Sequence, residues 1–260
     1  MQQYFVNDKF DINSTYNLSK DDSNHIVRIM RKKINDKIYV VFNDEIKYIC
    51  SIINDNIESV IVKPYEEVRG SNELPIKITI AIPPLKNDKT EYLIQKLTEL
   101  GVSNIVLFNS ERNIAKIKKD KVESKLNRWQ KIIKEAAEQS KRNLIPDITY
   151  IDCFEKLIEY SKSLDYKMVA YEKESINEDN YNLKKLLNGP LENKSVIAVF
   201  GSEGGLSEKE INTLTSSEFD VISLGKRILR AETAPLYFTS YISFLVNLNK
   251  GVMTWVLNWI

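Results

Sequence analysis

Three of the chain's eight glycines fall within five positions, in the stretch AVFGSEGGLSEKE over 198–210. Glycine is used where the backbone turns tightly, adopts positive φ or lies against a ligand. Gly201, Gly204 and Gly205 follow an apolar run and precede a capped helix, so the nearby N–H groups would favour an anion, and a flat ring could approach the bare backbone. A plain tight turn explains an isolated pattern of this kind equally well. Glu203, between the glycines, disfavours phosphate and favours a cationic or hydroxyl-rich ligand.

A second stretch, SLGKRILRAETAP over 223–235, also follows an apolar run. It combines apolar and charged side chains, namely Leu224, Ile228, Leu229, Arg227, Arg230 and Glu232. An apolar pocket beside paired charges suits a partly apolar ligand with a reactive polar end. A salt-bridged surface turn is the alternative, because exposed ion pairs are common and need no function.

Basic residues gather between a third candidate loop, FNSERN over 108–113, and the end of a long helix, EQSKRNLIP over 138–146. From Arg112 to Arg142 the chain carries eleven Lys or Arg against four Asp or Glu, a surplus of seven in a protein of formal net charge +1. Such a patch suits a phosphate backbone. A solvated helix face with ion pairs one turn apart is the alternative.

The elements that must position these loops are predicted from apolar runs that alternate with amphipathic stretches. Strands are predicted over 76–84, 104–110, 167–173, 196–202 and 221–225. Helices are predicted over 88–100, 120–140 and 206–214, with a last helix entered through Thr233 and Pro235. Gly101 marks a left-handed helix end, and Ser207 with Glu210 forms a capping box. The alternation indicates an α/β domain with a mainly parallel sheet, whose ligands bind at the carboxyl ends of the strands.

The first part of the chain has a different pattern, of short β segments separated by turn residues. Four such segments are predicted over 4–8, 37–43, 47–53 and 60–65, which indicates a small β-barrel. Between the first two, residues 22–33 show helical spacing of apolar residues beside Arg28, Arg31, Lys32 and Lys33. Residues 66–75 contain glycine, serine and proline and are predicted to be a linker.

Composition excludes several classes of protein. The two cysteines, Cys50 and Cys153, are too few for a disulfide framework or a cysteine-rich zinc site. The single histidine, His25, excludes a multi-histidine metal site and disfavours a Ser-His-Asp relay. These counts predict a protein without a metal site. Because the first ten residues lack a secretory signal, we expect the protein to be cytoplasmic. Polar residues interrupt the most apolar segment, 234–250, so it is interpreted as a core or interface helix.

Four motifs together make the chain recognisable. They are KLTELGVSNIVLFNSERN, EAAEQSKRNLIPDI, FGSEGGLSEKE and LGKRILRAETA, at 96–113, 135–148, 200–210 and 224–234. In this order they resemble the RsmE family of ribosomal RNA methyltransferases in the SPOUT superfamily. The resemblance covers nearly the whole chain, since HIVRIMRKKINDKIYVVFND at 25–44 is similar to the family's amino-terminal PUA-like barrel.

The resemblance implies a fold, a reaction and partners. Residues 1–70 would form a PUA-like RNA-binding β-barrel, and residues 71–260 a SPOUT methyltransferase domain with a deep trefoil knot, a mainly parallel sheet and helices on both faces. The implied methyl donor is S-adenosylmethionine. The implied substrate is ring nitrogen 3 of one uridine in 16S ribosomal RNA, presented as RNA or as the assembled 30S subunit, and the implied assembly is a homodimer through the second domain.

The resemblance also assigns residues. Those that would line the cofactor loops are Phe200, Gly201, Glu203, Gly204, Gly205, Leu224, Gly225, Ile228 and Leu229. Arg230 and Glu232 would be catalytic, with Arg230 stabilising the developing uracil anion and Glu232 orienting it or holding the loop. Residues that would contact RNA are Arg28, Arg31, Lys32, Arg112, Lys118, Lys119 and Arg142.

Some positions depart from the family pattern, and other functions stay open. Ser202 stands where the family commonly has proline, and Asn109 and Asn113 stand where other small residues are usual. A conventional Rossmann methyltransferase or dehydrogenase is the enzyme alternative, although no G-x-G-x-x-G follows the strand at 76–84. A non-catalytic RNA-binding module and a SPOUT enzyme for another RNA are further alternatives. The apolar end of the chain, with Trp255 and Trp259, is expected to pack at a dimer contact.

Overall fold

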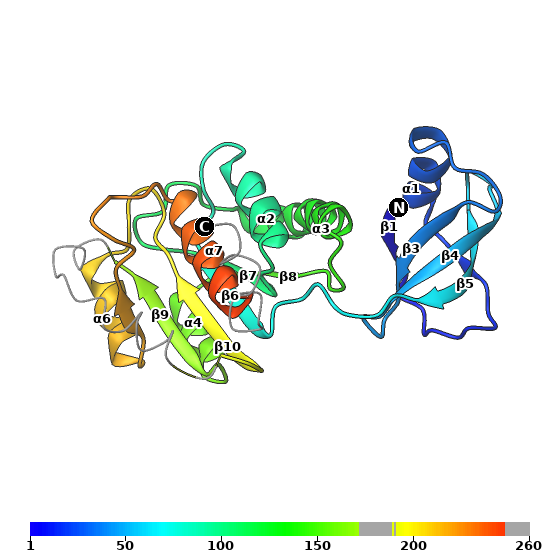
Figure 1. Cartoon of the computed structure of the whole chain (residues 1–260). Helices are drawn as coiled ribbons and strands as arrows, with labels where there is room; N and C mark the ends of the chain where they lie inside the picture. Colours follow the sequence, from blue (N-terminus) through cyan, green and yellow to red (C-terminus); the bar gives the residue numbers. More distant parts are fainter. Residues whose placement is uncertain (172–188, 190, 248–260) are drawn as a thin grey trace. The chain divides into compact units, whose positions relative to one another are not determined.

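The computed structural model describes residues 1–171, 189 and 191–247 (Figure 1). The chain divides into two compact units. Unit 1 comprises Met1–Glu73 and Ala137–Leu144, and unit 2 comprises Leu74–Ala136 and Ile145–Ile260. A short segment from the middle of the chain therefore returns to unit 1, which the linear division into 1–70 and 71–260 did not include. The predicted contact of Trp255 and Trp259 lies outside the described residues.

Unit 1 is built on a five-stranded sheet in the order β1-β3-β4-β5-β2. Its strands are β1 Gln3–Phe5, β2 Tyr16–Asn17, β3 Lys37–Val41, β4 Lys47–Asn54 and β5 Ile61–Glu67. Only β1 and β3 pair in parallel, and the other described pairs are antiparallel. Alternate residues of β3 and β4, such as Ile38, Cys50 and Ile52, are fully buried in one cluster. Every second residue of these strands is apolar and points inward, and these residues form the core of this unit.

The helix predicted over 22–33 is shorter in the structure and is not α-helical throughout. An α-helix, α1, spans Lys20–Asn24 and continues as one π-helical turn, η1, over His25–Ile29. Arg31 then takes a positive φ of 52°, which ends the helix. The basic residues after Ile29 therefore lie in a loop.

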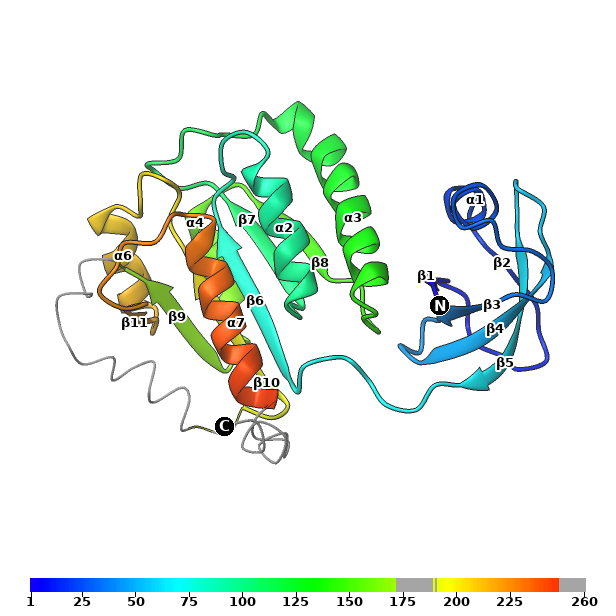
Figure 2. The same ribbon diagram turned by 45° about the horizontal axis from the view of Figure 1, so that its top comes forward.

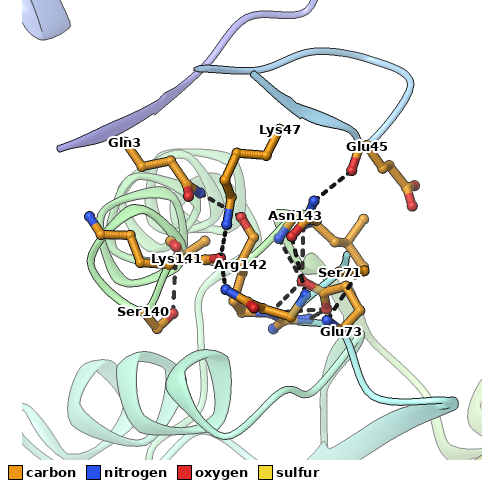
Figure 3. A network of polar contacts seen from close by, with 12 residues as sticks. Gln3, Glu45, Lys47, Ser71, Glu73, Ser140, Lys141, Arg142 and Asn143 are labelled. Atoms are coloured by element: carbon orange, nitrogen blue, oxygen red, sulfur yellow. Dashed lines mark hydrogen bonds and ion pairs between the residues drawn. The ribbon is translucent and has the colours of Figure 1, made fainter. Parts of the chain in front are cut away.

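Residues 137–144 are held within unit 1 by a polar network (Figure 3). Lys47 Nζ donates to the backbone oxygen of Lys141 at 2.8 Å, and Arg142 forms an ion pair with Glu73 at 2.5 Å. The side chain of Arg142 is only 3% exposed. The Glu73 carboxylate offsets the cost of burying this charge. The ion pair thus holds residues 137–144 to the segment after β5, and Lys47 holds them to β4 itself.

Unit 2 contains a six-stranded sheet in the order β11-β9-β10-β6-β7-β8, in which every pair is parallel. Its strands are β6 Ile76–Ile82, β7 Asn104–Phe108, β8 Asp147–Ile151, β9 Tyr166–Ala170, β10 Lys194–Val199 and β11 Asp220–Ile222. Among the described residues, its helices are α2 Lys89–Glu99, the 3₁₀ turn η2 Lys119–Lys121, α3 Val122–Gln139 (whose last turn belongs to unit 1), α4 Phe154–Ser161, α6 Glu208–Ser216 and α7 Thr233–Asn247.

Helices cover both faces of this sheet, as predicted (Figure 2). Side chains of α2, α3 and α7 share one apolar cluster with alternate residues of β6, such as Ile78 and Ile80. Side chains of α4 and α6 share a second cluster with Ala81, which lies between Ile80 and Ile82 on the same strand. The strands are apolar on both faces because both faces are covered. The expected trefoil knot stays a prediction.

Candidate functional site

The glycine turn follows the carboxyl end of β10 and is folded tightly on itself. Gly205 N donates to the Ser202 backbone oxygen at 2.9 Å, with Gly205 at a φ of +68°. A Cβ on Gly201 would lie 2.7 Å from the carbonyl carbon of Gly205, and one on Gly204 would lie 3.0 Å from the backbone oxygen of Arg112. The turn thus needs its glycines for its own packing, and it lies against the loop that carries Arg112.

Helix α6 begins directly after this turn with the predicted capping box. The Ser207 hydroxyl accepts from Glu210 N at 3.1 Å, and the Glu210 carboxylate accepts from Ser207 N at 2.8 Å. The same buried carboxylate accepts from Ser110 Oγ at 3.2 Å and from Glu111 N at 2.9 Å. Glu210 therefore joins the end of the glycine turn to the loop after β7. The sequence suggested its capping role but carried no signal for the second one.

The arginine-rich loop runs from the end of β11 to the start of α7. It turns at Gly225, whose φ is +103° and whose N–H donates to Ser223 Oγ at 3.2 Å. The backbone oxygen of Arg230 accepts from Thr233 N at 2.8 Å and Ala234 N at 3.0 Å, which begins α7. The backbone of Arg230 is thus fixed by the helix start, whereas its side chain is exposed.

The two predicted loops meet at one pocket of about 580 Å³ in unit 2. It is lined by Lys89, Arg112, Ala170, Tyr171, residues 200–206, residues 223–225, residues 227–232 and Ala234. These residues follow the carboxyl ends of β6, β7, β9, β10 and β11, the edge at which parallel sheets bind ligands. The structure thus brings together all eleven residues predicted as cofactor-binding or catalytic.

Charges of both signs line the pocket. Lys89 forms an ion pair with Glu232 at 3.1 Å, and the Glu232 side chain is 14% exposed. Partial burial opposes ionisation of Glu232, but its backbone hydrogen bond and Lys89 outweigh that effect and hold its pKa below the ordinary value. Within the described residues, Arg227 and Arg230 have no carboxylate within ion-pair distance. The pocket therefore offers an ionised acid and guanidinium groups that form no ion pair among the described residues.

Sequence reasoning missed several lining residues. Lys89 begins α2, and Tyr171 and Ser223 follow β9 and β11. Arg112 was predicted as an RNA contact, and the structure adds it to the pocket wall. Lys89 lies at the start of the helix predicted over 88–100, and Tyr171 and Ser223 lie within the strands predicted over 167–173 and 221–225. Their positions near the ends of predicted elements were the available signal, but such ends could not be ranked by sequence alone.

The other predicted RNA contacts lie outside this pocket. Arg28 lies in η1, Arg31 and Lys32 follow it, and all three belong to unit 1. Exposed Lys118 and Lys119 lie at η2 in unit 2. Arg142 differs from all of these, because its guanidinium is buried and bound to Glu73 (Figure 3). A guanidinium held in this way does not present its charge to a phosphate, so Arg142 is left out of the proposals below.

Two further features concern the described residues alone. None of their helices combines the length and the apolar character that crossing a bilayer requires. Their His, Cys, Asp and Glu side chains form no group of three or more that could hold a metal ion.

Comparisons with known proteins agree with this geometry. A family model described as the RNA methyltransferase domain matches residues 72–243, and one described as the RNA methyltransferase PUA domain matches residues 18–65. Ribosomal RNA small subunit methyltransferase E of Bacillus subtilis is 36% identical and aligns over 96% of this chain and 99% of its own. The namesake from Mesomycoplasma hyopneumoniae is 33% identical over 91% of this chain and 96% of its own.

A solved structure has the same fold over nearly the whole chain. It is a methyltransferase from Legionella pneumophila in complex with SAM, with a TM-score of 0.81 and 26% identity. The similarity covers 92% of this chain and 95% of that one.

Proposed function

The chain belongs to the family of ribosomal RNA small subunit methyltransferases E, and from that membership we propose that it methylates ring nitrogen 3 of one uridine in 16S ribosomal RNA, using S-adenosylmethionine. RNA is the substrate class of the family. The observation that carries the proposal is that the glycine turn, the arginine-rich loop and Arg112 line the same pocket. We propose that the substrate is either the RNA or the assembled 30S subunit and that the reaction takes place in the cytoplasm.

The residues of the pocket fit this methyl donor. S-adenosylmethionine supplies an electrophilic methyl group on a positively charged sulfur. Glu203 and the ionised Glu232 supply negative charge for such a cation. Apart from the glycine itself and its two neighbours in the chain, no described residue has an atom within 4 Å of the place that a Cβ on Gly205 or Gly225 would occupy, so both backbones are open to a ligand. The residues proposed to hold it are Phe200, Gly201, Glu203, Gly204, Gly205, Leu224, Gly225, Ile228 and Leu229.

Arg230 and Glu232 are proposed to act on the uracil. The N3 proton must leave as the ring attacks the methyl carbon, and the negative charge that develops needs stabilisation. The Arg230 guanidinium does this without titrating, from a backbone fixed at the start of α7. Because Lys89 helps to keep the pKa of Glu232 low, Glu232 is a weak base, which suits orientation rather than proton removal.

Basic residues outside the centre of the pocket are proposed to hold the RNA. These are Arg28, Arg31, Lys32, Arg112, Lys118 and Lys119. Replacing Lys118 and Lys119 with Gln should reduce the salt dependence of RNA binding, because each phosphate contact releases counterions. An unchanged slope of log affinity against log salt would remove both from the RNA surface.

A homodimer through unit 2 is also proposed, and an exposed face of α7 supports it. Tyr237, Tyr241 and Phe244 are 46%, 39% and 57% exposed in the described structure. Their spacing of four and three residues places them on one side of the helix. An aromatic stripe of this kind is typical of a surface that a partner covers.

Methyl transfer to a defined substrate tests the proposal. The purified chain is incubated with tritiated S-adenosylmethionine and small subunits that lack the modification, or with the RNA extracted from them. The modified nucleotide is then mapped by mass spectrometry. We expect label at N3 of one uridine. Label on another base or another RNA would overturn the proposed substrate, and binding of a nicotinamide dinucleotide in place of S-adenosylmethionine would overturn the enzyme class.

A further inference from the structure

Two interruptions in the pairing of β4 with β5 set two side chains apart from the rest of the unit 1 sheet. The residues on either side of Tyr65 pair with consecutive residues of β4, so Tyr65 is an extra residue in β5. The residues on either side of Ile53 likewise pair with consecutive residues of β5. Both are β-bulges, which re-aim a side chain and recur at functional positions.

Both bulge residues are large, apolar and exposed. Tyr65 is 62% exposed and Ile53 is 42% exposed. The buried residues beside them, Pro64 and Ile52, belong to the inward-facing positions of the same strands. The bulges therefore turn outward two side chains that add nothing to the core of unit 1.

A cation lies over the exposed tyrosine. Lys37 Nζ is 4.3 Å from the centroid of the Tyr65 ring, and Lys37 pairs in register with Ser51, which in turn pairs with Lys63. Lys37 and Lys63 are exposed, and neither has a carboxylate partner among the described residues. The Ser51 hydroxyl, the Tyr65 ring and two ammonium groups, of which that of Lys37 contacts the ring, therefore share this side of the sheet.

The end of the basic loop after η1 bonds to β4 beside the bulge at Ile53. Asn35 N donates to the Ile52 oxygen at 2.8 Å, and Ile52 N donates to the Asp36 oxygen at 2.9 Å. These bonds place the loop that carries Arg31 and Lys32 next to the bulge at Ile53. The exposed face is thus continuous with residues already proposed to contact RNA.

We propose that this face, made by Lys37, Ser51, Ile53, Lys63 and Tyr65, binds a single-stranded segment of the ribosomal RNA, with one base stacked on the Tyr65 ring. The proposal rests on the proposed function, since it assumes that the substrate is RNA. Aromatic rings stack on unpaired bases of any sequence while lysines contact the phosphates beside them. Glu66 and Glu67 follow Tyr65 and repel phosphate, so the RNA backbone lies on the Lys63 side of the ring.

Binding of a fluorescein-labelled single-stranded fragment of the small-subunit RNA, measured with the full chain, tests the surface. Tyr65→Ala should weaken binding roughly fivefold to a hundredfold, whereas Tyr65→Phe should stay within about twofold, because phenylalanine keeps the stacking ring. Lys37→Gln and Lys63→Gln should each lower the slope of log affinity against log salt by about 0.7. The matched control is Lys20→Gln, since exposed Lys20 in the same unit is bound to Glu58 at 2.6 Å.

Methyl transfer separates this inference from the proposed function. With Tyr65→Ala, KM for RNA should rise while kcat at saturating RNA stays unchanged, because the residue is not part of the pocket. Unchanged RNA affinity in Tyr65→Ala, with normal slopes for both lysine variants, would overturn the inference and leave the proposed function intact. Weakened binding to assembled subunits alone, with naked RNA bound normally, would also overturn it, because the occupant would then be a ribosomal protein. Lack of methyl transfer by the unaltered chain would reject the proposed function instead.

Discussion

At the residue scale, the pocket divides its cations into two kinds. Lys89 forms an ion pair with Glu232, whereas Arg227 and Arg230 form no ion pair within the described structure. Arginine stays protonated throughout the physiological range, so the site can stabilise an anion without titrating itself. Sequence reasoning selected Arg230 and Glu232 from their motif but could not find Lys89, because 143 residues separate it from its partner.

Arg230 gives the most direct test of the site. Arg230→Ala should lower kcat for methyl transfer roughly a hundredfold to a thousandfold, the usual effect of removing one group that stabilises a developing anion. The affinity for S-adenosylmethionine, measured by calorimetry, should change by less than about twofold, since the backbone of residue 230 still caps α7. Turnover equal to that of the unaltered enzyme would remove Arg230 from the catalytic residues.

Asp165 gives a test of acid stability away from the pocket. Hydrogen bonds from the Ser195 hydroxyl at 2.7 Å and from Lys194 at 2.9 Å, together with Ser195 N, lower its pKa from 3.8 to about 2. Because the folded-state pKa is the lower one, the carboxylate stabilises the fold above pH 3.8, and this contribution is lost as the pH falls through about 2. Asp165→Asn should therefore unfold more readily than the unaltered chain at neutral pH.

The difference in free energy of unfolding between Asp165→Asn and the unaltered chain should shrink as the pH falls below 3.8. Below that pH the unfolded chain takes up a proton at Asp165 before the folded chain does. Urea unfolding at a series of pH values measures it. A deficit that is independent of pH would show that the loss comes from packing rather than from the charge of Asp165. Asp55→Asn, on an aspartate with no ion pair in the described structure, is the matched control.

At the scale of elements, single residues were sufficient to predict where a helix begins or ends when the residue type is strongly preferred at that position. Gly101 takes a φ of +95° after α2, and Ser207 caps α6, both as predicted. Strand β8 was missed because it is an edge strand with exposed polar residues such as Asp147 and Thr149, so its apolar alternation is weak. Helix α4 was missed although Phe154, Leu157 and Ile158 have helical spacing, because its eight residues are fewer than the window over which periodicity distinguishes a helix from other structure.

The start of α6 predicts two different losses of stability. Ser207→Ala should cost about 1 kcal/mol, the usual effect of losing an N-cap. Glu210→Ala should cost about 2 kcal/mol or more, because it also leaves Ser110 Oγ and Glu111 N without their buried acceptor. Urea unfolding of both variants measures the difference, with the exposed Thr213→Ala on the same helix as control. Equal losses in both variants would mean that the link to the loop after β7 contributes nothing.

At the scale of the whole molecule, contacts distant in sequence define the units. Residues 137–144 belong with 1–73 because Arg142 pairs with Glu73 and Lys47 binds the Lys141 oxygen. The linear division assigned this segment to the second domain, and the family resemblance implied an RNA contact for Arg142. The buried position of that arginine depends on a carboxylate 69 residues earlier, which no local pattern reveals.

The proposed dimer belongs to this scale as well. Phe244→Glu should convert the dimer to a monomer, because it places a charge in the middle of an apolar contact at the exposed face of α7. Light scattering of the purified protein measures the mass, with Glu208→Gln on α6 as a control on another helix. A monomeric unaltered chain would contradict the proposal outright. A variant that stays dimeric would move the contact away from α7.

The sequence by itself determined the alternation of strands and helices, the small β unit before it, and the loops that carry the site. These follow from apolar periodicity and from glycine and capping residues, which act over a few positions. Only the tertiary structure decided which loops share a pocket, that Lys89 pairs with Glu232, that Glu210 joins two loops, and that Arg142 is buried. The pocket contacts depend on the order of strands in the unit 2 sheet, and the burial of Arg142 depends on the return of residues 137–144 to unit 1, so both bring together residues that no local pattern connects.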